Sequence, residues 1–151
     1  MAQSTLISSD NNNMELATFY IGDALCGMDI LRIQEINKHM EMTVVPQAPA
    51  YVMGILNLRG QIVTVIDLGQ KLGLASTKLG EESRNIIVTS KDEYIGLVVD
   101  RICDVVEANR DMMEVPPANI GAIQGVFFEG VFKTENNLIG ILDVEEILKE
   151  E

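Results

Sequence analysis

The sequence predicts a mainly β fold made of two small antiparallel barrels, each with about five strands. Three observations lead to this prediction. Short apolar runs of strand length are separated by turn residues roughly every eight to twelve positions, no long helical pattern lies between them, and segments of the first half return in the second half. The length of 151 residues fits a single compact domain with a substantial core.

The internal repeat is clearest between 62–72 and 138–148, and it aligns Asp67 with Asp143, 143 − 67 = 76 positions later. A weaker sequence similarity, with an offset of 69 positions, relates two further segments, 27–33 and 96–102. Two offsets of similar size indicate a duplicated chain. Chance similarity between strand-then-helix segments is the alternative.

The first strands are predicted at 16–21 and 24–28, joined by the polar pair Gly22–Asp23, which suits a tight hairpin turn. The apolar spacing at 30–36 fits a helix as well as a strand, and we predict a helical turn followed by a strand. Two prolines within 46–49 then impose an extended connection.

The stretch 54–68 is the most informative segment and reads Gly-Ile-Leu-Asn-Leu-Arg-Gly-Gln-Ile-Val-Thr-Val-Ile-Asp-Leu. Two apolar runs flank the polar turn 57–61, which predicts a β-hairpin. Asp67 then suits the N-cap of a short helix, because its carboxylate can accept from backbone N–H groups left unpaired there. A second short helix is predicted at 144–149, behind Asp143.

The segment 75–85 is rich in Ser, Thr, Gly, Lys and Glu, and it is predicted to be a linker that divides the two halves. Beyond it we predict strands at 86–88 and 94–106 around the turn 90–93, the second strand being long enough to bend between layers. The remaining predicted elements are an extended connection at 115–117, strands at 123–128 and 131–132 joined through Glu129–Gly130, a turn at 135–137 and a strand at 138–142.

The composition indicates which binding partners and which cell compartment to expect. A formal net charge of −12 works against nucleic acid and anionic membrane surfaces, since both attract clusters of Lys and Arg. The stretch 1–13 lacks the basic residues of a secretory signal and is predicted to be a disordered leader, while no window is apolar enough to span a bilayer. We therefore expect a cytoplasmic protein, in which Cys26 and Cys103 are small buried thiols.

The sequence gives little support for catalysis. The only histidine, His39, lies in a polar stretch that predicts a solvated residue. Four carboxylates follow apolar strands and are better explained as caps and strand-end solvation than as metal ligands: Asp67, Asp100, Asp104 and Asp143. An enzyme would need a polar pocket with convergent titratable groups, so protein binding without a metal or cofactor is the prediction.

The segment 54–68 closely resembles the signature of CheW-type chemotaxis coupling proteins. Four other stretches also resemble elements of this family and occur in the same order: 27–36, 46–49, 96–100 and 141–144. The resemblance spans about 14–149. The resemblance implies a single CheW-like domain over 14–151, made of two intertwined SH3-like five-stranded barrels with short helices around a shared core. We place the approximate divide between the two barrel lobes in the linker 75–85.

The resemblance also implies a function without catalysis. Proteins of this family are adaptors that couple transmembrane chemoreceptors, the methyl-accepting chemotaxis proteins, to the histidine kinase CheA. They grip the helical tip of the receptor and pair with the CheW-like regulatory domain of the kinase. We expect the same here, in a protein that is monomeric when free and recruited to membrane-associated receptor arrays. The alternative is the same role in a non-flagellar array for surface motility or biofilm control.

The resemblance implies that the receptor binds an apolar groove between the barrels, where Glu35 and Arg59 fall on positions that the family uses as a charged pair. The predicted receptor-binding residues are Ile33, Glu35, Leu58, Arg59, Val98 and Val105. The alternatives are a solvated surface pair for the two charges and a core position for the aliphatic residues. Thr64 and Gly69 depart from the family pattern, which often has Pro and Arg there.

Overall fold

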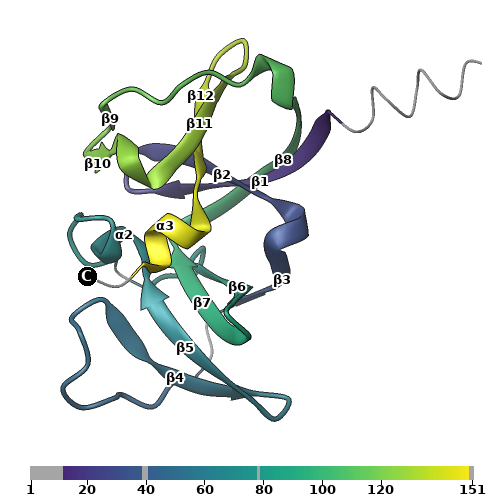
Figure 1. The fold of residues 1–151 in the computed structure, drawn as a ribbon. Helices are drawn as coiled ribbons and strands as arrows, with labels where there is room; N and C mark the ends of the chain where they lie inside the picture. The colour runs from purple at the N-terminus through teal and green to yellow at the C-terminus, as the bar shows by residue number, and fades with distance from the viewer. Residues whose placement is uncertain (1–11, 39–40, 78, 150–151) are drawn as a thin grey trace, which may run out of the picture.

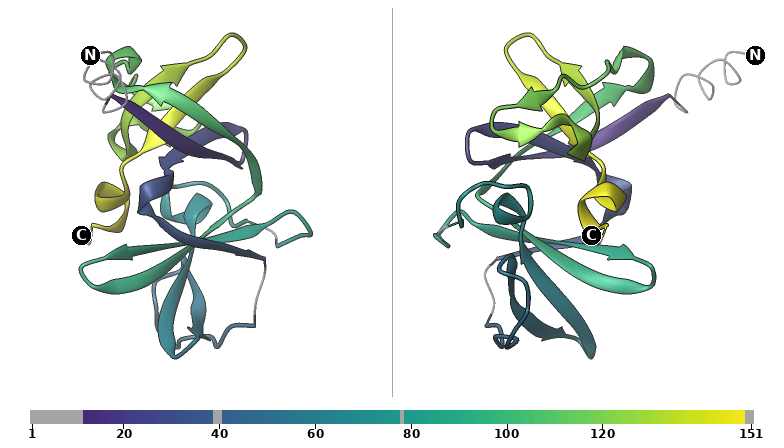
Figure 2. Two further views of the ribbon diagram at one scale, coloured as in Figure 1. Left: turned by 90° about the vertical axis from the view of Figure 1, so that its right-hand side faces the viewer. Right: turned by 60° about the vertical axis from the view of Figure 1, so that its left-hand side comes forward.

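The computed structural model describes residues 12–38, 41–77 and 79–149. Its first sheet has the strand order β11-β12-β2-β1-β8, and its second sheet has the order β3-β6-β7-β5-β4. The predicted mainly β fold with two five-stranded units is thereby confirmed. Figure 1 shows one sheet above the other, with two short helices between them, and Figure 2 shows the same arrangement from two further sides.

The elements have the following bounds. The first sheet consists of β1 (Asn13–Ile21), β2 (Ala24–Asp29), β8 (Arg101–Asn109), β11 (Phe128–Lys133) and β12 (Leu138–Leu142). The second sheet consists of β3 (Ile33–Lys38), β4 (Val52–Leu58), β5 (Gln61–Asp67), β6 (Arg84–Ser90) and β7 (Glu93–Val99). The smaller elements are α2 (Leu68–Lys71), α3 (Val144–Leu148), the pair β9 (Asn119–Ile120) and β10 (Ile123–Gln124), and 3-10 turns at Ile30–Arg32, Arg110–Met112 and Gly125–Phe127.

The duplication read from the sequence is present in the pairing of the strands. The two sheets have the same strand order when β1, β2, β8, β11 and β12 are matched with β6, β7, β3, β4 and β5. Registers agree as well: Gly27 pairs with Ile141 in the first sheet, and Gly96 pairs with Val65 in the second. These are the same offsets of 69 and 76 positions that the sequence shows.

Each half of the chain contributes to both sheets. The chain leaves the first sheet after Asp29 to form β3, and it leaves the second sheet at Asp100 to form β8. The long predicted strand 94–106 thus bends between layers, as expected. The segment 75–85 separates the two repeats in the sequence and connects α2 to β6, with β5 before α2 and β6 after the segment both in the second sheet. The approximate divide between the lobes in this segment stays a prediction.

Each sheet is closed by the segment that follows its edge strand. Thr43, beyond β3, exchanges two backbone hydrogen bonds of 2.8 Å with Ile55 of β4. Glu114, beyond β8, makes the equivalent pair with Val131 of β11, with both bonds at 2.9 Å. We call the closed sheets the first and second barrels. Closure matters because it pairs strand edges that would otherwise remain exposed.

The hairpin turns follow the predicted chemistry, with one exception. Gly22–Asp23 joins β1 to β2, and Lys91–Asp92 joins β6 to β7 with positive φ at both residues. The predicted turn at Glu129–Gly130 is wrong, because β11 runs through these residues and their pairing with β12 only shifts register there. A Cβ atom at Gly130 would lie 2.8 Å from Met113 Cε and 3.2 Å from the carbonyl oxygen of Glu114, so a larger residue there would displace the end of the Met113 side chain.

The core has three layers because the central strands bury both faces. Ile86 and Val88 of β6 point into a cluster shared by both barrels and both helices, whereas Ile87 points into the second barrel. The interior of the first barrel is a separate cluster, formed around five buried residues: Met14, Leu16, Ala108, Ile139 and Ile141. The continuous apolar runs of the central strands are the sequence signature of this double burial.

The remaining predictions concern cysteines, the leader and the membrane. Cys26 is fully buried and Cys103 partly so, and both are free thiols. Burial raises the pKa of Cys26 to about 12. Of the predicted leader, residues 1–11 lie outside the described part, and β1 already begins at Asn13. None of the helices in the described ranges is long and apolar enough to cross a membrane.

The two repeated aspartates cap their helices with different numbers of bonds. Asp67 is buried and accepts from the backbone N–H of Gln70 at 3.2 Å and of Thr77 at 2.8 Å. Asp143 is half-buried and accepts only from Glu146 N–H, at 3.1 Å, among the described residues.

We predict that Asp67→Ala lowers the free energy of unfolding by about 2 to 3 kcal/mol, and that the matched variant Asp143→Ala lowers it by about 1 kcal/mol. The reason is that Asp67→Ala leaves two partly buried donors unpaired, the backbone N–H groups of Gln70 and Thr77. Urea unfolding followed by far-ultraviolet circular dichroism measures both values. Equal losses in the two variants would contradict this account of the caps.

Candidate functional site

The predicted charged pair is present, and it lies where the second barrel closes. Arg59 Nη2 donates to Glu35 Oε1, which joins the β4–β5 turn to β3. In the strand order, β3 and β4 are the two outer strands of this sheet, so the pair connects its opposite edges. The Arg59 side chain is 70% exposed and that of Glu35 is 27% exposed, so most of the guanidinium faces solvent.

Arg59 occupies a backbone position that normally favours Gly, Asn or Asp. Its φ is 52° and that of Gly60 is 87°, which is the conformation of the tight turn that best joins twisted strands. Asn57 Oδ1 accepts from Gly60 N–H at 2.9 Å and holds the turn in place. Placing a residue with a Cβ atom at a positive φ costs about 1 kcal/mol of folding free energy. Such backbone strain is found more often at functional positions than elsewhere.

The first barrel has no counterpart of this ion pair. The offsets of 69 and 76 positions place Asp104 where Glu35 lies and Glu135 where Arg59 lies. Two carboxylates at these positions cannot pair with each other at neutral pH. The ion pair is therefore a feature of the second barrel alone, added to an otherwise repeated framework.

The other predicted receptor residues lie in three different surroundings. Ile33 and Leu58 are partly buried beside the core clusters, on the same strands that lead to Glu35 and Arg59. Val98 is only 3% exposed and lines the interior of the second barrel, so it offers no surface to a partner. Val105 is 57% exposed on β8, in the first sheet.

The structure thus brings together Glu35 and Arg59, with Leu58 next to Arg59 in the chain. A register shift between Ile33 and Glu35 places Ile33 opposite Val88 and Glu35 opposite Ile87, so these two side chains lie on different faces of β3. We call the ion pair and its neighbours along β3 and the β4–β5 hairpin the Arg59 face; it consists of Glu35, Ile36, Leu58, Arg59 and Ile62. Its two isoleucines are large apolar side chains left open to solvent, Ile36 at 40% and Ile62 at 58% exposure. A face with a charge beside apolar groups suits docking of an amphipathic helix.

A second apolar surface was missed in the sequence reading. It is a groove at the closure of the second barrel, which we call the Val44 groove. Its apolar residues are Met42, Val44, Met53, Ile55, Leu56 and Leu79, and three polar residues also line it: Glu41, Thr43 and Asn57. Val44 is 75% exposed and Leu79 is 41% exposed. The signal was the apolar pair Val44-Val45 just before a proline, where the extended backbone cannot bury both side chains.

Charged side chains tie the two barrels together near α3. Arg32 donates to Glu145 Oε2 at 2.8 Å, and Ser90 Oγ lies 3.1 Å from the other oxygen of Glu145. These two hydrogen bonds lower the pKa of Glu145. Burial, reinforced by the nearby carboxylate of Asp143, raises the pKa of Glu129.

Three of the four carboxylates predicted to act as caps or strand-end groups accept from the backbone, and the Asp104 carboxylate makes no such bond among the described residues. Asp67 and Asp143 cap helices, and Asp100 Oδ2 accepts from Gly22 N–H at 2.6 Å. No group of three or more potential metal ligands occurs within residues 12–38, 41–77 and 79–149. His39, predicted to be solvated, lies outside the described residues.

The architecture of two intertwined five-stranded barrels with exposed apolar and charged faces is that of a protein-binding β module. The family model for the CheW-like domain matches residues 15–151, and the chain belongs to the CheW family. The resemblance noted in the sequence is thereby confirmed.

Individual relatives agree with this assignment. The chain is 31% identical to chemotaxis protein CheW of Treponema pallidum (strain Nichols), over 91% of this chain and 84% of that protein. It is 33% identical to chemotaxis protein CheW of Helicobacter pylori, over 91% of this chain and 83% of that protein. The crystal structure of scaffolding protein TtCheW from Thermoanaerobacter tengcongensis matches with a TM-score of 0.82 and 31% identity, covering 91% and 88% of the two chains.

We predict that Arg59→Gly changes the free energy of unfolding by no more than about 1 kcal/mol. The variant loses an exposed ion pair worth at most about 1 kcal/mol, but it also relieves the strained φ. Lys91→Gly is the matched control, because Lys91 has the same φ of 52° in the β6–β7 turn. If urea unfolding showed that Arg59→Gly lowers the free energy of unfolding by more than about 2 kcal/mol relative to this control, the main role of the ion pair would be to stabilise the fold and not to bind a partner.

Proposed function

We propose that this protein is a non-catalytic adaptor that couples the cytoplasmic tip of transmembrane chemoreceptors to the histidine kinase CheA. The observation that carries the proposal is the exposed Arg59–Glu35 pair on a strained turn, present in one barrel and missing from its repeat. Membership of the CheW family supports it, as does the scaffolding role in the name of the solved relative.

The receptor is proposed to bind the Arg59 face. A receptor tip is a helical hairpin, and a helix offers apolar side chains on one stripe with charges beside them. Ile36 and Ile62 would contact the apolar stripe, while Arg59 would bind a carboxylate. The guanidinium has five N–H donors, and its bond to Glu35 leaves several of them for a partner.

The kinase is proposed to bind the Val44 groove. An adaptor that bridges two partners needs two surfaces that do not overlap, and this groove shares no residue with the Arg59 face. Its methionines, Met42 and Met53, are flexible and adapt to apolar side chains of a partner. The partner would be the CheW-like regulatory domain of CheA, in a cytoplasmic array at the receptors, with the adaptor monomeric when free.

We predict that Arg59→Glu weakens binding of a receptor tip fragment at least tenfold. The variant places a second carboxylate beside that of Glu35 and removes the N–H donors of the guanidinium. The double variant Glu35→Arg/Arg59→Glu, which restores the ion pair in reverse, should recover stability but not receptor affinity. Isothermal titration calorimetry measures both. Unchanged affinity in Arg59→Glu would place this residue outside the receptor site.

We predict that Val44→Asp weakens binding of the CheA regulatory domain at least tenfold, since a carboxylate would be desolvated in an apolar interface. Receptor binding should stay within about twofold, since the Arg59 face is untouched. The control is Val115→Asp, which changes a side chain that is 87% exposed in the first barrel. Equal losses from Val44→Asp and Val115→Asp would contradict the assignment of the groove.

A further inference from the structure

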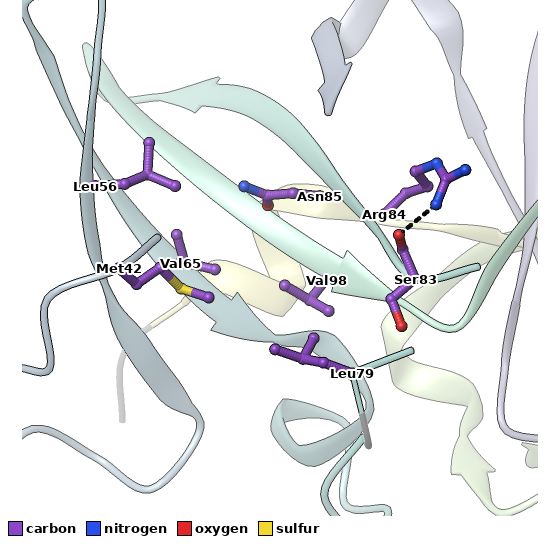
Figure 3. Close-up of a pocket in the computed structure, with 8 residues that line it drawn as sticks. All are labelled: Met42, Leu56, Val65, Leu79, Ser83, Arg84, Asn85 and Val98. Atoms are coloured by element: carbon purple, nitrogen blue, oxygen red, sulfur yellow. Dashed lines mark hydrogen bonds between the residues drawn. The ribbon is translucent and has the colours of Figure 1, made fainter. Parts of the chain in front are cut away.

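Two hollows at the second barrel differ in what they can hold. The cavity inside the barrel, drawn in Figure 3, is lined in part by Asn85 of β6, which pairs with Asn37 of β3. It measures about 10 Å³, which is close to the space that one water molecule needs. A cleft of about 500 Å³ opens beside α3, and α2, β5 and the β6–β7 hairpin also line it. We call it the Lys91 cleft, and only this cleft is large enough to admit side chains of another molecule.

The Lys91 cleft gathers positive charge in an acidic chain. The formal net charge of the chain is −12, yet three lysines line this one cleft: Lys71, Lys91 and Lys149. Lys149 Nζ lies 3.1 Å from a carboxylate oxygen of Glu146. Lys71 and Lys91 make no ion pair among the described residues. Their ammonium groups are therefore available to carboxylates of a ligand.

Two carboxylates also line the cleft, and they differ in their partners. Glu145 accepts from Arg32 at 2.8 Å and from Ser90 at 3.1 Å. Glu93 is exposed at the start of β7 and makes no ion pair among the described residues. A densely anionic surface, such as a nucleic acid or a lipid membrane, would be repelled by these carboxylates. A peptide differs, because its backbone N–H groups can donate to Glu93 while its own carboxylates bind the lysines.

The cleft also has an apolar part. Ile66, Ile95 and Leu148 line it, and Ile95 and Leu148 are only partly buried. Tyr51 lines it too, and Lys71 Nζ lies 4.4 Å from the centre of the Tyr51 ring. This cation–π contact holds the ammonium group at the cleft. The lining therefore fits a ligand that carries an apolar group next to negative charges.

The first barrel shows that the corresponding place beside its own hairpin can hold a stretch of chain. The turn at Gly22 is the counterpart of the turn at Lys91, 91 − 22 = 69 positions later, and each turn lines a cleft. Residues 74–77, which follow α2 without forming a helix or strand, also line the cleft at Gly22. Leu74 Cδ1 is 3.4 Å from the position that a Cβ atom at Gly22 would take. After α3 the described chain continues only to Lys149, so no described residues take the equivalent place in the Lys91 cleft.

We propose that the Lys91 cleft binds a short acidic segment of a partner protein, with an apolar side chain flanked by carboxylates. The apolar side chain packs on Ile95 and Leu148, and the carboxylates bind Lys71 and Lys91. The segment takes the place that residues 74–77 take in the first barrel. The cleft shares no residue with the Arg59 face or the Val44 groove, so the inference does not depend on the partners proposed above.

A nuclear magnetic resonance titration of the isotope-labelled full chain with the peptide acetyl-Asp-Glu-Leu-Asp-Glu-amide tests the site. We expect saturable shifts at the backbone amides of Lys71, Lys91 and Ile95. The double variant Lys71→Gln/Lys91→Gln should weaken binding about fivefold or more, because two ion pairs are lost. The matched control is Lys38→Gln/Lys133→Gln, which changes the net charge equally at two lysines outside the cleft and should bind within about twofold of the parent. Equal losses in the two double variants, or no shifts at the cleft, would overturn the proposal.

The probe supplies a second test that leaves the protein unchanged. Replacing the leucine of the peptide by glycine should weaken binding about fivefold, because Ile95 and Leu148 are then left uncovered. Unchanged affinity would mean that charge alone attracts the peptide, against the proposal. Two further outcomes would assign the cleft to another occupant and overturn the proposal. One is binding of phosphatidylserine vesicles at the cleft without binding of the peptide, and the other is self-association of the parent that Lys71→Gln/Lys91→Gln abolishes.

Discussion

The structure depends on one topological constraint, which is that each repeat sends a strand into the sheet of the other. β3 completes the second barrel after the chain has built β1 and β2 of the first, and β8 does the reverse. Neither barrel can form without residues from both halves. The shared cluster around Phe19, Met28 and Leu97 then lies between the sheets and fixes their relative position.

This repeated framework makes the differences between the two barrels informative. Where both barrels have the same residue type, as at Asp67 and Asp143, the reason is local structure. At two positions where they differ, the second barrel has the costlier choice, with Arg59 on a positive φ and Asn85 in the interior. Both differences involve β3, which carries Glu35 and Asn37 on one face. Costly features concentrated on one strand are expected at a functional surface.

The sequence predicted what local chemistry controls. Hairpin turns, helix caps and the repeat offsets follow from Gly22–Asp23, Asp67 and Asp143. The exchange of β8 was predicted in part, because 94–106 is long enough to bend between layers and the family resemblance implies intertwined barrels. The exchange of β3 could not be predicted from the residues themselves, because two repeats are equally compatible with separate barrels. For Val98 the sequence left both a receptor-binding position and a core position open, since a strand covered on both faces has no alternation to show which side is which, and the structure places it in the core. Glu129–Gly130 was misread because a bulge and a turn both favour glycine.

The central claim is that one small chain binds receptor and kinase at the same time through separate surfaces of its second barrel. Sedimentation velocity of the protein with a receptor tip fragment and the CheA regulatory domain tests this claim most directly. We predict a species that contains all three components. If the two partners instead competed, so that adding the kinase domain released the receptor fragment, the account would be contradicted.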